Sequence, residues 1–319
     1  MGVYLKDFDT HAEYSAYISG AQAVLPNVSY CEDNNEVHYN PYVPETPSLM
    51  VYYDIQDISS PTTIFTNYDN TVVKSLEIDN AEMIDTFSDG NVAYQFNSIG
   101  EHVIKYNFNT VDKVGNNSPL FNGLSTPKRA VITNGITTIG NYVFYYCSGL
   151  TSVTIPESVT SIGNYSFQNC TGLTNVTLNG GVTIGDNAFY QCSSLTNINI
   201  PNTVTSIGSN AFDDTGLTSI TIPNSVTTIG HYAFYGCNDL ITATIGTGVT
   251  SIGNYAFGGD TSLISVTIQA TTPPSLGTTG VFGGNASSRK IYVPSASVTS
   301  YQGATNWSTY AADIEAIPT

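Results

Sequence analysis

Charged side chains are scarce in this sequence, and basic ones are the scarcest. Only 10% of the 319 residues are charged, against about 25% in an average soluble protein. Lys and Arg number 8 against 25 Asp and Glu, a formal net charge of −17. Nucleic-acid binding needs basic side chains that neutralise phosphates, so this composition argues against a nucleic-acid partner. No hydrophobic run approaches the roughly 18 residues of a membrane span, so no membrane partner is expected.

Motifs for catalysis and metal binding are missing as well. The sequence has no G-x-S-x-G, H-E-x-x-H, Walker loop or dinucleotide-binding fingerprint. Its acidic runs at 32–36 and 85–89 lack the spacing and closing Glu of an EF-hand, which favours solvated loops. The five cysteines form no C-x-x-C pair or Cys/His cluster of the kind that binds zinc. We therefore expect no enzyme activity, no cofactor and no metal.

The N-terminus shows no secretion signal. Its first residues, MGVYLKDFDTHAEY, have no basic segment followed by an apolar one. Two interpretations are open: a protein of cytosolic origin, such as a virion protein assembled in the host cytoplasm, or a mature form whose signal has been removed.

An internal repeat dominates the chain after about residue 130. An Ile-Gly pair recurs every 22 or 23 residues, a Phe follows each Ile by five residues, and a Leu then opens a strand-like run such as LTSVTIP. The pairs begin at Ile139, Ile162, Ile184, Ile207, Ile229 and Ile252. Degraded copies precede them at 132–139 and follow them at 276–282. Such a period predicts a solenoid, because one short unit cannot bury its apolar residues alone.

The pattern within one unit predicts which side chains face inward. Val153 and Ile155 are two residues apart, so they share the buried side of a strand, while Ser152 and Thr154 face outward. The units with 22 residues arise from deletions in LNGGVTIG and in FDDTGL. These deletions spare every position predicted to be in the core, as a solenoid requires.

The units resemble the leucine-rich repeats of the BspA-like (Treponema pallidum-type) family, as in LTSVTIPESVTSIGNYSFQNCTG. The similarity covers about residues 130–284 and implies a mainly β fold, a curved right-handed solenoid of about six 22–23-residue turns with a parallel sheet on its concave face. The C-terminal run from Lys290 also resembles the segment that closes such arrays. It predicts a last strand, 290–293, and two short amphipathic helices that carry Val298, Tyr301, Trp307, Tyr310 and Ile314, with Trp307 anchoring the cap.

Four cysteines occupy one column of the repeat. Cys147, Cys170, Cys192 and Cys237 are predicted to be a structural core column of small apolar side chains. A disulfide between stacked neighbours is the alternative, since the spacing of adjacent strands falls within the Cα range of such bonds. The parallel Cβ directions would strain that bond.

The first half has a different organisation. Thr10 and Glu13 form a capping box and Gly20 a stop signal, which predicts a short helix before a polar, Pro-rich stretch with one or two hairpin strands. The opening LKDFDTHAEY…AVLPNVSYCEDNNEVHYNP is similar to the N-termini of virion proteins of phages infecting gut Bacteroidetes. That resemblance implies that residues 1–47 dock onto other virion proteins.

Short alternating strands follow at 50–55, 63–66, 72–78, 92–96 and 102–108. They predict a small antiparallel sandwich resembling bacterial immunoglobulin-like modules. The expected domains are therefore an N-terminal docking arm (1–47), an immunoglobulin-like β domain (48–115), the leucine-rich repeats (116–284) and a C-terminal cap (285–319).

The outward positions of the repeat strands form a flat, uncharged face rich in hydroxyl and amide groups, which is our candidate binding face. Its residues are Ser152, Thr154, Asn175, Thr177, Asn197, Asn199, Ser219, Thr221, Thr242, Thr244, Ser265 and Thr267. The alternative is that Thr is simply a favourable solvent-facing residue in strands. A second set of side chains, including Tyr142, Tyr165, Tyr232 and Tyr255, is predicted on the turns, where tyrosines stack on sugars or pack turn against turn.

Together these features predict a non-enzymatic binding protein. The leading hypothesis is a phage virion structural protein, a fibre or decoration protein, whose repeats adhere to a host-surface or mucosal glycan or protein. The alternative is a secreted bacterial BspA-like surface adhesin with its signal peptide removed. A glycan-acting enzyme is a third, weaker hypothesis, and homo-oligomerisation is left open.

Overall fold

The computed structural model describes residues 120–180 and 183–318 continuously and, before residue 120, a set of separate strands. The chain forms two compact units, residues 1–46 and 47–319. Strands make up nearly all the regular structure that is described, and helical turns in these regions occur only close to the C-terminus. The fold is therefore mainly β, as the sequence predicts.

The first unit contains a three-stranded sheet. Strands β1 (Val3–Asp7), β2 (Val28–Cys31) and β3 (Glu36–Tyr39) are arranged in the order β1-β3-β2, with both pairs antiparallel. The β2–β3 pair fits the predicted hairpin. The helix predicted after Thr10 lies outside the described residues.

The predicted strands of residues 48–115 are confirmed. Strands β4, β9, β6 and β7 form an antiparallel sheet in that order, and β5 pairs with β8. Their bounds are Ser48–Ile55 (β4), Thr62–Tyr68 (β5), Val73–Ile78 (β6), Ala81–Met83 (β7), Gly90–Tyr94 (β8) and Gly100–Phe108 (β9). An immunoglobulin-like sandwich stays a prediction.

This region joins the repeats through a shared sheet. Strand β4 pairs antiparallel with β11 (Pro127–Ile132), the first long strand of the solenoid. Behind that junction the hydroxyls of Tyr53 and Tyr106 lie 2.9 Å apart, both buried. Tyr106 meets Phe121 edge-on, and Phe121 stacks on Phe144. The antiparallel strands thus close the first end of the solenoid core.

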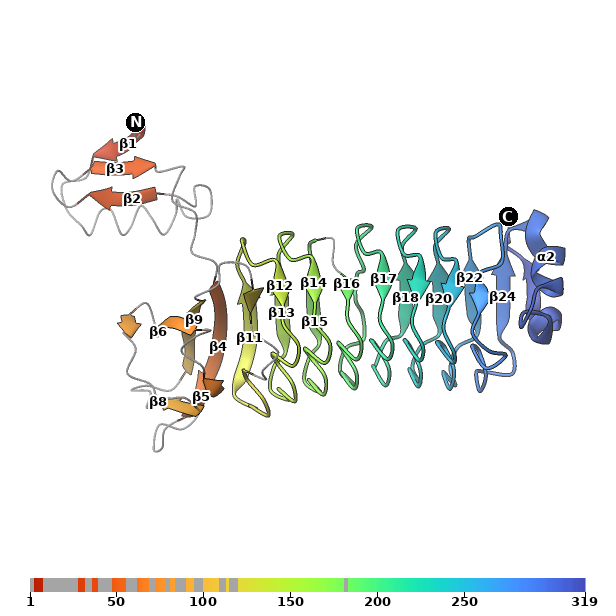
Figure 1. Cartoon of the computed structure of the whole chain (residues 1–319), viewed down its shortest axis with the longest axis horizontal. Helices are drawn as coiled ribbons and strands as arrows, with labels where there is room; N and C mark the ends of the chain where they lie inside the picture. Colours follow the sequence, from red (N-terminus) through yellow and green to blue (C-terminus); the bar gives the residue numbers. More distant parts are fainter. Residues whose placement is uncertain are drawn as a thin grey trace. The chain divides into compact units, whose positions relative to one another are not determined.

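The repeats stack into a solenoid of about eight turns, whose parallel strands belong to three sheets (Figure 1). One consists of two-residue strands and runs unbroken through eight of them: β10 (Lys113–Val114), β12 (Thr138–Ile139), β14 (Ser161–Ile162), β16 (Thr183–Ile184), β17 (Ser206–Ile207), β19 (Thr228–Ile229), β21 (Ser251–Ile252) and β23 (Ser275–Leu276). The four-residue strands lie in the other two sheets. One contains β13 (Ser152–Ile155) and β15 (Asn175–Leu178) next to β11, and the other contains β18 (Ser219–Ile222), β20 (Thr242–Ile245), β22 (Ser265–Ile268) and β24 (Lys290–Val293).

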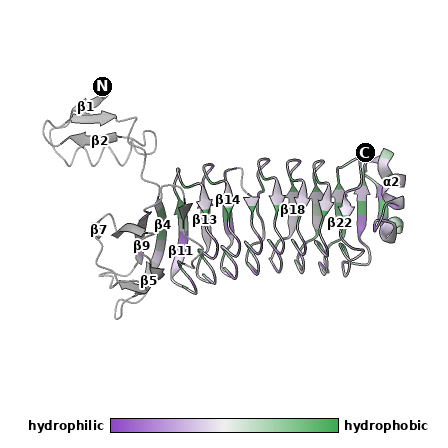
Figure 2. Cartoon of the chain, in the orientation of Figure 1, coloured by the Kyte–Doolittle hydropathy of each residue, from purple (hydrophilic) through white to green (hydrophobic). Residues whose placement is uncertain are grey.

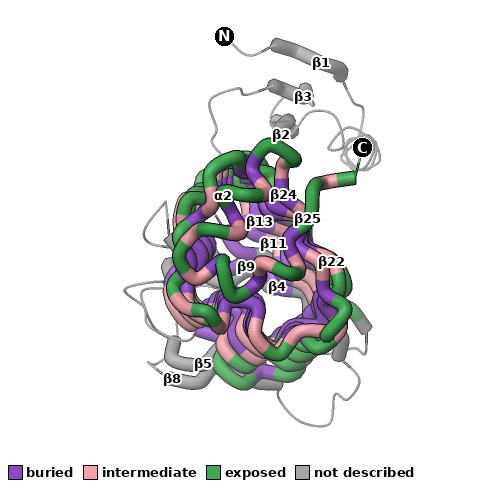
Figure 3. Tube along the Cα trace, turned by 90° about the vertical axis from the view of Figure 1, so that its right-hand side faces the viewer, coloured by how far each residue is buried: buried purple, intermediate pink, exposed green. Residues whose placement is uncertain are grey.

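A ladder of phenylalanines runs through the interior of these turns. Neighbouring rings stack nearly parallel, with centroids 5.0–5.7 Å apart, from Phe121 to Phe282. The end view shows the buried residues lining the inside of the tube and the exposed ones outside (Figure 3). Each turn thus covers the apolar face of the next, which is why the isolated unit would not be stable.

The C-terminal segment covers the last turn. It comprises β24, the 3-10 segments η1 (Ser295–Ser297) and η2 (Ser308–Asp313), the helix α2 (Val298–Gly303) and the strand β25 (Ile314–Ala316). The last strand of the prediction, Lys290–Val293, matches β24. The prediction of two helices carrying Ile314 is wrong at that residue, because Ile314 is extended and pairs with Ile291 in a parallel ladder.

Trp307 lies at the start of η2 and is completely buried. Its indole Nε1–H donates to the carbonyl of Pro274 at 2.7 Å, and Tyr301 Oη donates to the carbonyl of Ala270 at 2.7 Å. Both side chains therefore tie the cap to the backbone of the last turn. None of the helices in the described regions has the length and apolarity needed to cross a bilayer.

Candidate functional site

The outward residues of the four-residue strands lie in two straight columns. In the parallel pairing of β13 with β15, Ser152 lies beside Asn175 and Thr154 beside Thr177. The same register relates Ser219 to the next two strands. Adjacent strands are spaced by about 4.8 Å, so each column presents a polar group at every step. The inward residues between them are buried, as the alternating pattern predicts.

Hydroxyl groups of the solenoid fall into two classes. Threonines at the ends of the strands donate to the carbonyl of the preceding turn: Thr151 Oγ1 to Lys128 at 2.8 Å, and Thr160 Oγ1 to Thr137 at 3.2 Å. The same bond recurs on later turns, from Thr174, Thr183, Thr218, Thr227, Thr250 and Ser275. These hydroxyls hold one turn to the next.

The twelve residues of the candidate binding face belong to the other class. None of their side chains makes a hydrogen bond within the described part of the chain, and all twelve are at least partly exposed. Their hydroxyl and amide groups are therefore free to meet a ligand. The alternative, that Thr is simply a favourable solvent-facing residue in strands, predicts the same exposure and stays open.

Charged pairs stand at both ends of this neutral face. Arg129, beside Ser152, is 3.6 Å from Glu101 Oε1, and Lys290, beside Ser265, is 2.5 Å from Glu315 Oε1. In the hydropathy colouring the strongest hydrophilic shade falls at β11 and near the C-terminal cap, with paler strands between (Figure 2). The face itself carries no ionisable side chain, so a neutral partner fits it better than a charged one.

The cysteine column lies inside the turns. Cys147, Cys170, Cys192 and Cys237 are buried free thiols. Each donates to the carbonyl of a Phe in the preceding turn, at 2.8–3.1 Å. Burial raises the pKa of all four thiols, which leaves them protonated and unreactive.

A buried carboxyl in the same column escaped the sequence analysis. Asp260 stands 23 residues after Cys237, in the next cysteine position, and is completely buried. Its Oδ1 accepts the backbone N–H of Cys237 at 2.8 Å, whereas Oδ2 has no partner. Burial raises the pKa of Asp260 to about 9. Counting 23 residues on from Cys237 would have found it.

The tyrosines of the turns pack mainly on each other. Tyr142 stacks on Tyr165 with centroids 4.8 Å apart, and Tyr232 on Tyr255 at 5.4 Å. All four have a positive φ, between 53° and 62°. That conformation suits Gly or Asn better than Tyr, and Asn187 and Asn210 occupy the column between the two pairs. Their stacking supports the packing interpretation, although Tyr232 and Tyr255 stay exposed.

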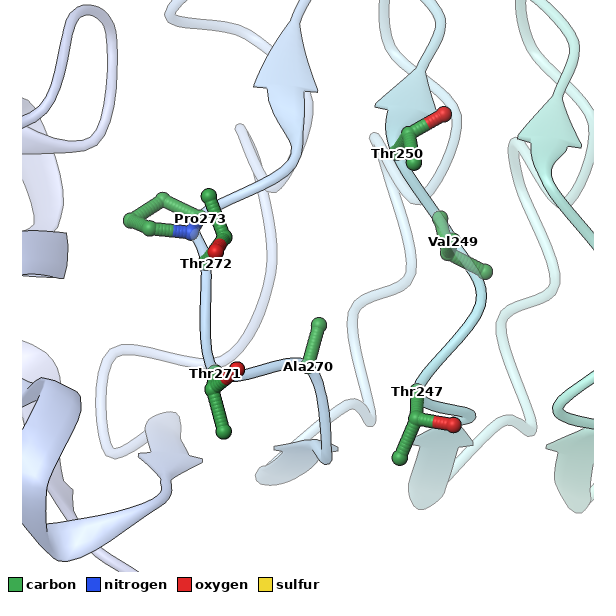
Figure 4. A pocket seen from close by; sticks show the side chains of 7 residues that line it. All are labelled: Thr247, Val249, Thr250, Ala270, Thr271, Thr272 and Pro273. Atoms are coloured by element: carbon green, nitrogen blue, oxygen red, sulfur yellow. The ribbon is translucent and has the colours of Figure 1, made fainter.

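A cavity of about 300 Å³ lies between two neighbouring turns near the cap. It is lined by Thr247, Val249, Thr250, Ala270, Thr271, Thr272 and Pro273. Figure 4 shows that these side chains come from the connections after β20 and β22. It contains no ionisable group that could act as an acid, a base or a nucleophile.

The regions described hold no group of three or more His, Cys, Asp or Glu residues placed to bind a metal. His231 has a structural contact, because its Nδ1 accepts the backbone N–H of Asn254 at 2.8 Å. Asn141 and Asn164 accept the equivalent N–H with their side-chain oxygens. The position after Ile-Gly is therefore a cap between turns, which the sequence alone did not show.

Several solved structures of leucine-rich repeat proteins are similar to this chain. A crystal structure of a leucine-rich repeat protein from T. pallidum is 28% identical, covering 56% of this chain and 90% of its own with a TM-score of 0.46. A leucine-rich cell surface protein from Faecalibacterium prausnitzii is 27% identical over 59% of this chain and 65% of its own, with a TM-score of 0.37. A leucine-rich repeat protein from Bacteroides ovatus is 19% identical over 73% and 90%, with a TM-score of 0.26.

No curated protein matches the chain. The family model of the BspA-type leucine-rich repeat region matches it in six copies, over residues 89–183, 112–240 and 182–305. Since these matches span more than half of the sequence, the chain belongs to the BspA-type leucine-rich repeat family.

Proposed function

We propose that this protein is a non-enzymatic surface adhesin whose repeats bind a neutral glycan or protein surface. The observation that carries the proposal is the candidate binding face, twelve uncharged residues with unused hydrogen-bonding groups on a stacked, well-packed scaffold. Family membership supports it, because BspA-type repeat proteins are generally binding or adhesion proteins of bacterial surfaces.

Electrostatics define the kind of partner. With a net charge of −17 and no charge on the face, the protein lacks the basic patch that would steer an acidic ligand towards it. Hydroxyl and amide groups recognise neutral partners through many individually weak hydrogen bonds. Affinity would then come from several turns acting together.

Two experiments test this proposal. Antibody labelling of intact cells that make the protein, followed by protease treatment, should show the chain at the cell surface; a purely intracellular signal would contradict it. The second experiment is a pull-down, in which the full-length chain should bind host mucosal material. A pair of outward alanine substitutions, Thr177→Ala with Thr221→Ala, should weaken that binding without lowering the thermal midpoint.

A second candidate, a structural protein of a phage particle, is favoured by the N-terminal sequence alone. Residues 1–47 resemble the opening of phage virion proteins, and the three-stranded sheet β1-β3-β2 would then be the docking element. Mass spectrometry of purified virions tests this candidate, and absence of the chain from the particle would exclude it.

A further inference from the structure

The candidate binding face is interrupted at its middle. Elsewhere, neighbouring outward residues of consecutive strands are 23 residues apart, as from Ser152 to Asn175 and from Ser219 to Thr242. Asn197, however, follows Asn175 by 22 residues and precedes Ser219 by 22. The strand expected at 197–200 is thus the one with a shortened unit on both sides.

The parallel sheet breaks at this place. Residues 197–200 are not paired as a strand; one sheet ends at β15 and another begins at β18 (Figure 1). The backbone N–H and C=O groups of these four residues make no hydrogen bond with the described residues of the turns on either side, which are all but 181 and 182. The sheet of two-residue strands continues unbroken past the same turn, through the pairing of Ile184 with Ile207.

Side-chain burial shows that the surface opens here. We call this region the seam and define it as Asn175, Thr177, Asn197, Asn199, Ser219 and Thr221. All six are exposed, whereas five of the other six residues of the face are only partly exposed. The layer below is looser too, since Val176 is 6% exposed and Ile198 5%, against 1% for Val153.

A break of this kind leaves hydrogen-bonding groups of both polarities at the surface. The backbone donors and acceptors of 197–200, which a sheet normally pairs, have no hydrogen-bond partner among the described residues. They lie next to three Asn amides that each offer a donor and an acceptor. Unpaired strand edges elsewhere attract another strand. Here both sides of the break are turns of the same chain, so an added strand has no edge to extend.

The occupant must therefore approach from above the face and offer both donors and acceptors. A sugar chain does so, because its hydroxyls are both, and it carries no charge that would need a basic partner. We propose that the seam is the principal contact site of the face and that it binds a neutral glycan chain. This inference rests on the proposed function and identifies where on the face, and with which chemistry, binding occurs.

Hydrogen exchange tests the structural premise without any ligand. In the full-length protein the amides of 197–200 should exchange at least 100-fold faster than those of 153–155 and 220–222, which lie in β13 and β18. Equal protection of the three segments would overturn the proposal, because no backbone groups would then be free at the seam.

Affinity electrophoresis tests the binding itself. The probes are three dissolved polysaccharides: a neutral galactomannan, a neutral β-1,3-glucan and the acidic polygalacturonate. The wild-type chain should be retarded by at least one neutral probe and not by polygalacturonate. The double variant Asn197→Ala with Asn199→Ala should then bind at least 10-fold more weakly. The comparison variant Thr244→Ala with Thr267→Ala, on the same face outside the seam, should weaken binding by a clearly smaller factor than the seam variant does.

The outcomes separate the two proposals. An equal loss of affinity in both double variants would show that the seam is not the principal contact site. That result would remain consistent with adhesion by the whole face. Retardation by polygalacturonate alone, or by no probe, would overturn a neutral glycan as the ligand, while the mucosal pull-down still decides adhesion to a protein. Thermal unfolding and circular dichroism of each variant show that the solenoid is intact.

Discussion

The interior and the outward face of this solenoid are made by alternate residues of the same repeats, yet they behave differently. The interior keeps its phenylalanine ladder and its buried Val, Ile and Leu residues through every turn, including the shortened ones. The outward face keeps its polar chemistry but loses its strand pairing at 197–200. Stability is therefore located in the interior column and the threonine ladders, and the recognition that we propose is located in residues that the scaffold does not use.

The largest expected effect on stability comes from a substitution in the phenylalanine ladder of the interior. Phe189 is completely buried and stacks between Phe167 and Phe212 at 5.3 and 5.4 Å. The substitution Phe189→Ala should lower the free energy of unfolding by about 3–5 kcal/mol, because it removes apolar contacts and leaves a cavity. Urea denaturation followed by circular dichroism measures it; a loss below about 1 kcal/mol would show that the turns collapse around the gap.

The buried carboxyl of Asp260 makes the free energy of unfolding depend on pH. Burial raises the pKa of Asp260 to about 9, while an unfolded Asp titrates near 3.9. Between these values the folded state holds a proton that the unfolded state has lost. The stability contributed by the neutral carboxyl is complete below about pH 4 and declines towards pH 9, by up to about 1.4 kcal/mol per pH unit.

The variant Asp260→Cys restores the residue found at Cys237 and should remove most of that slope. Denaturation midpoints at pH 5 and pH 8 should then differ less for the variant than for the wild-type chain. A residual slope is expected from Asp213, whose pKa burial raises to about 6. Identical slopes in the two proteins would mean that Asp260 is ionised in the fold.

A smaller effect is expected from the threonine ladder between turns. Thr227 Oγ1 donates to the carbonyl of Thr205 at 3.2 Å. Thr227→Val keeps the shape but removes the donor, so we expect a loss of about 0.5–1.5 kcal/mol. Thr221→Val, on the binding face, is the matched control and removes no internal hydrogen bond. Equal losses in chemical denaturation would contradict the division of the threonines into two classes.

The smallest effect on stability is expected on the outward face itself. The double variant Thr177→Ala with Thr221→Ala removes exposed hydroxyls that the fold does not use, so stability should change by no more than about 0.5 kcal/mol. Differential scanning calorimetry checks this. A fall in the midpoint comparable to that of Phe189→Ala would show that the face also holds the solenoid together.

The sequence predicted the architecture well where the information is periodic. Val153 and Ile155 are buried and Ser152 and Thr154 face outward, as alternation requires. Residues 290–293 form the last long strand, as their pattern indicates. These features depend on the local spacing of apolar and polar residues, and the same spacing recurs in every repeat.

Features that depend on contacts between turns could not be predicted from the sequence. No local pattern shows that β4 pairs with β11. Nor does one show that the Thr160 hydroxyl donates a hydrogen bond to a carbonyl of the preceding turn while the Thr154 hydroxyl makes none within the described chain. Cys237 and Asp260 share one column, and only the burial of that column makes the carboxyl a neutral group. Ile314 reads as part of a helix until its pairing with Ile291 is known.

The sequence by itself determined that this chain is a repetitive, mainly β solenoid with a neutral polar face. The recurring Ile, Phe and Leu positions leave no other way to bury them than stacking. Only the tertiary structure decided where that face opens. Whether 197–200 pairs with its neighbours depends on how two shortened turns place three chain segments relative to one another. That placement arises from the packing of whole turns, not from the residues of the strand.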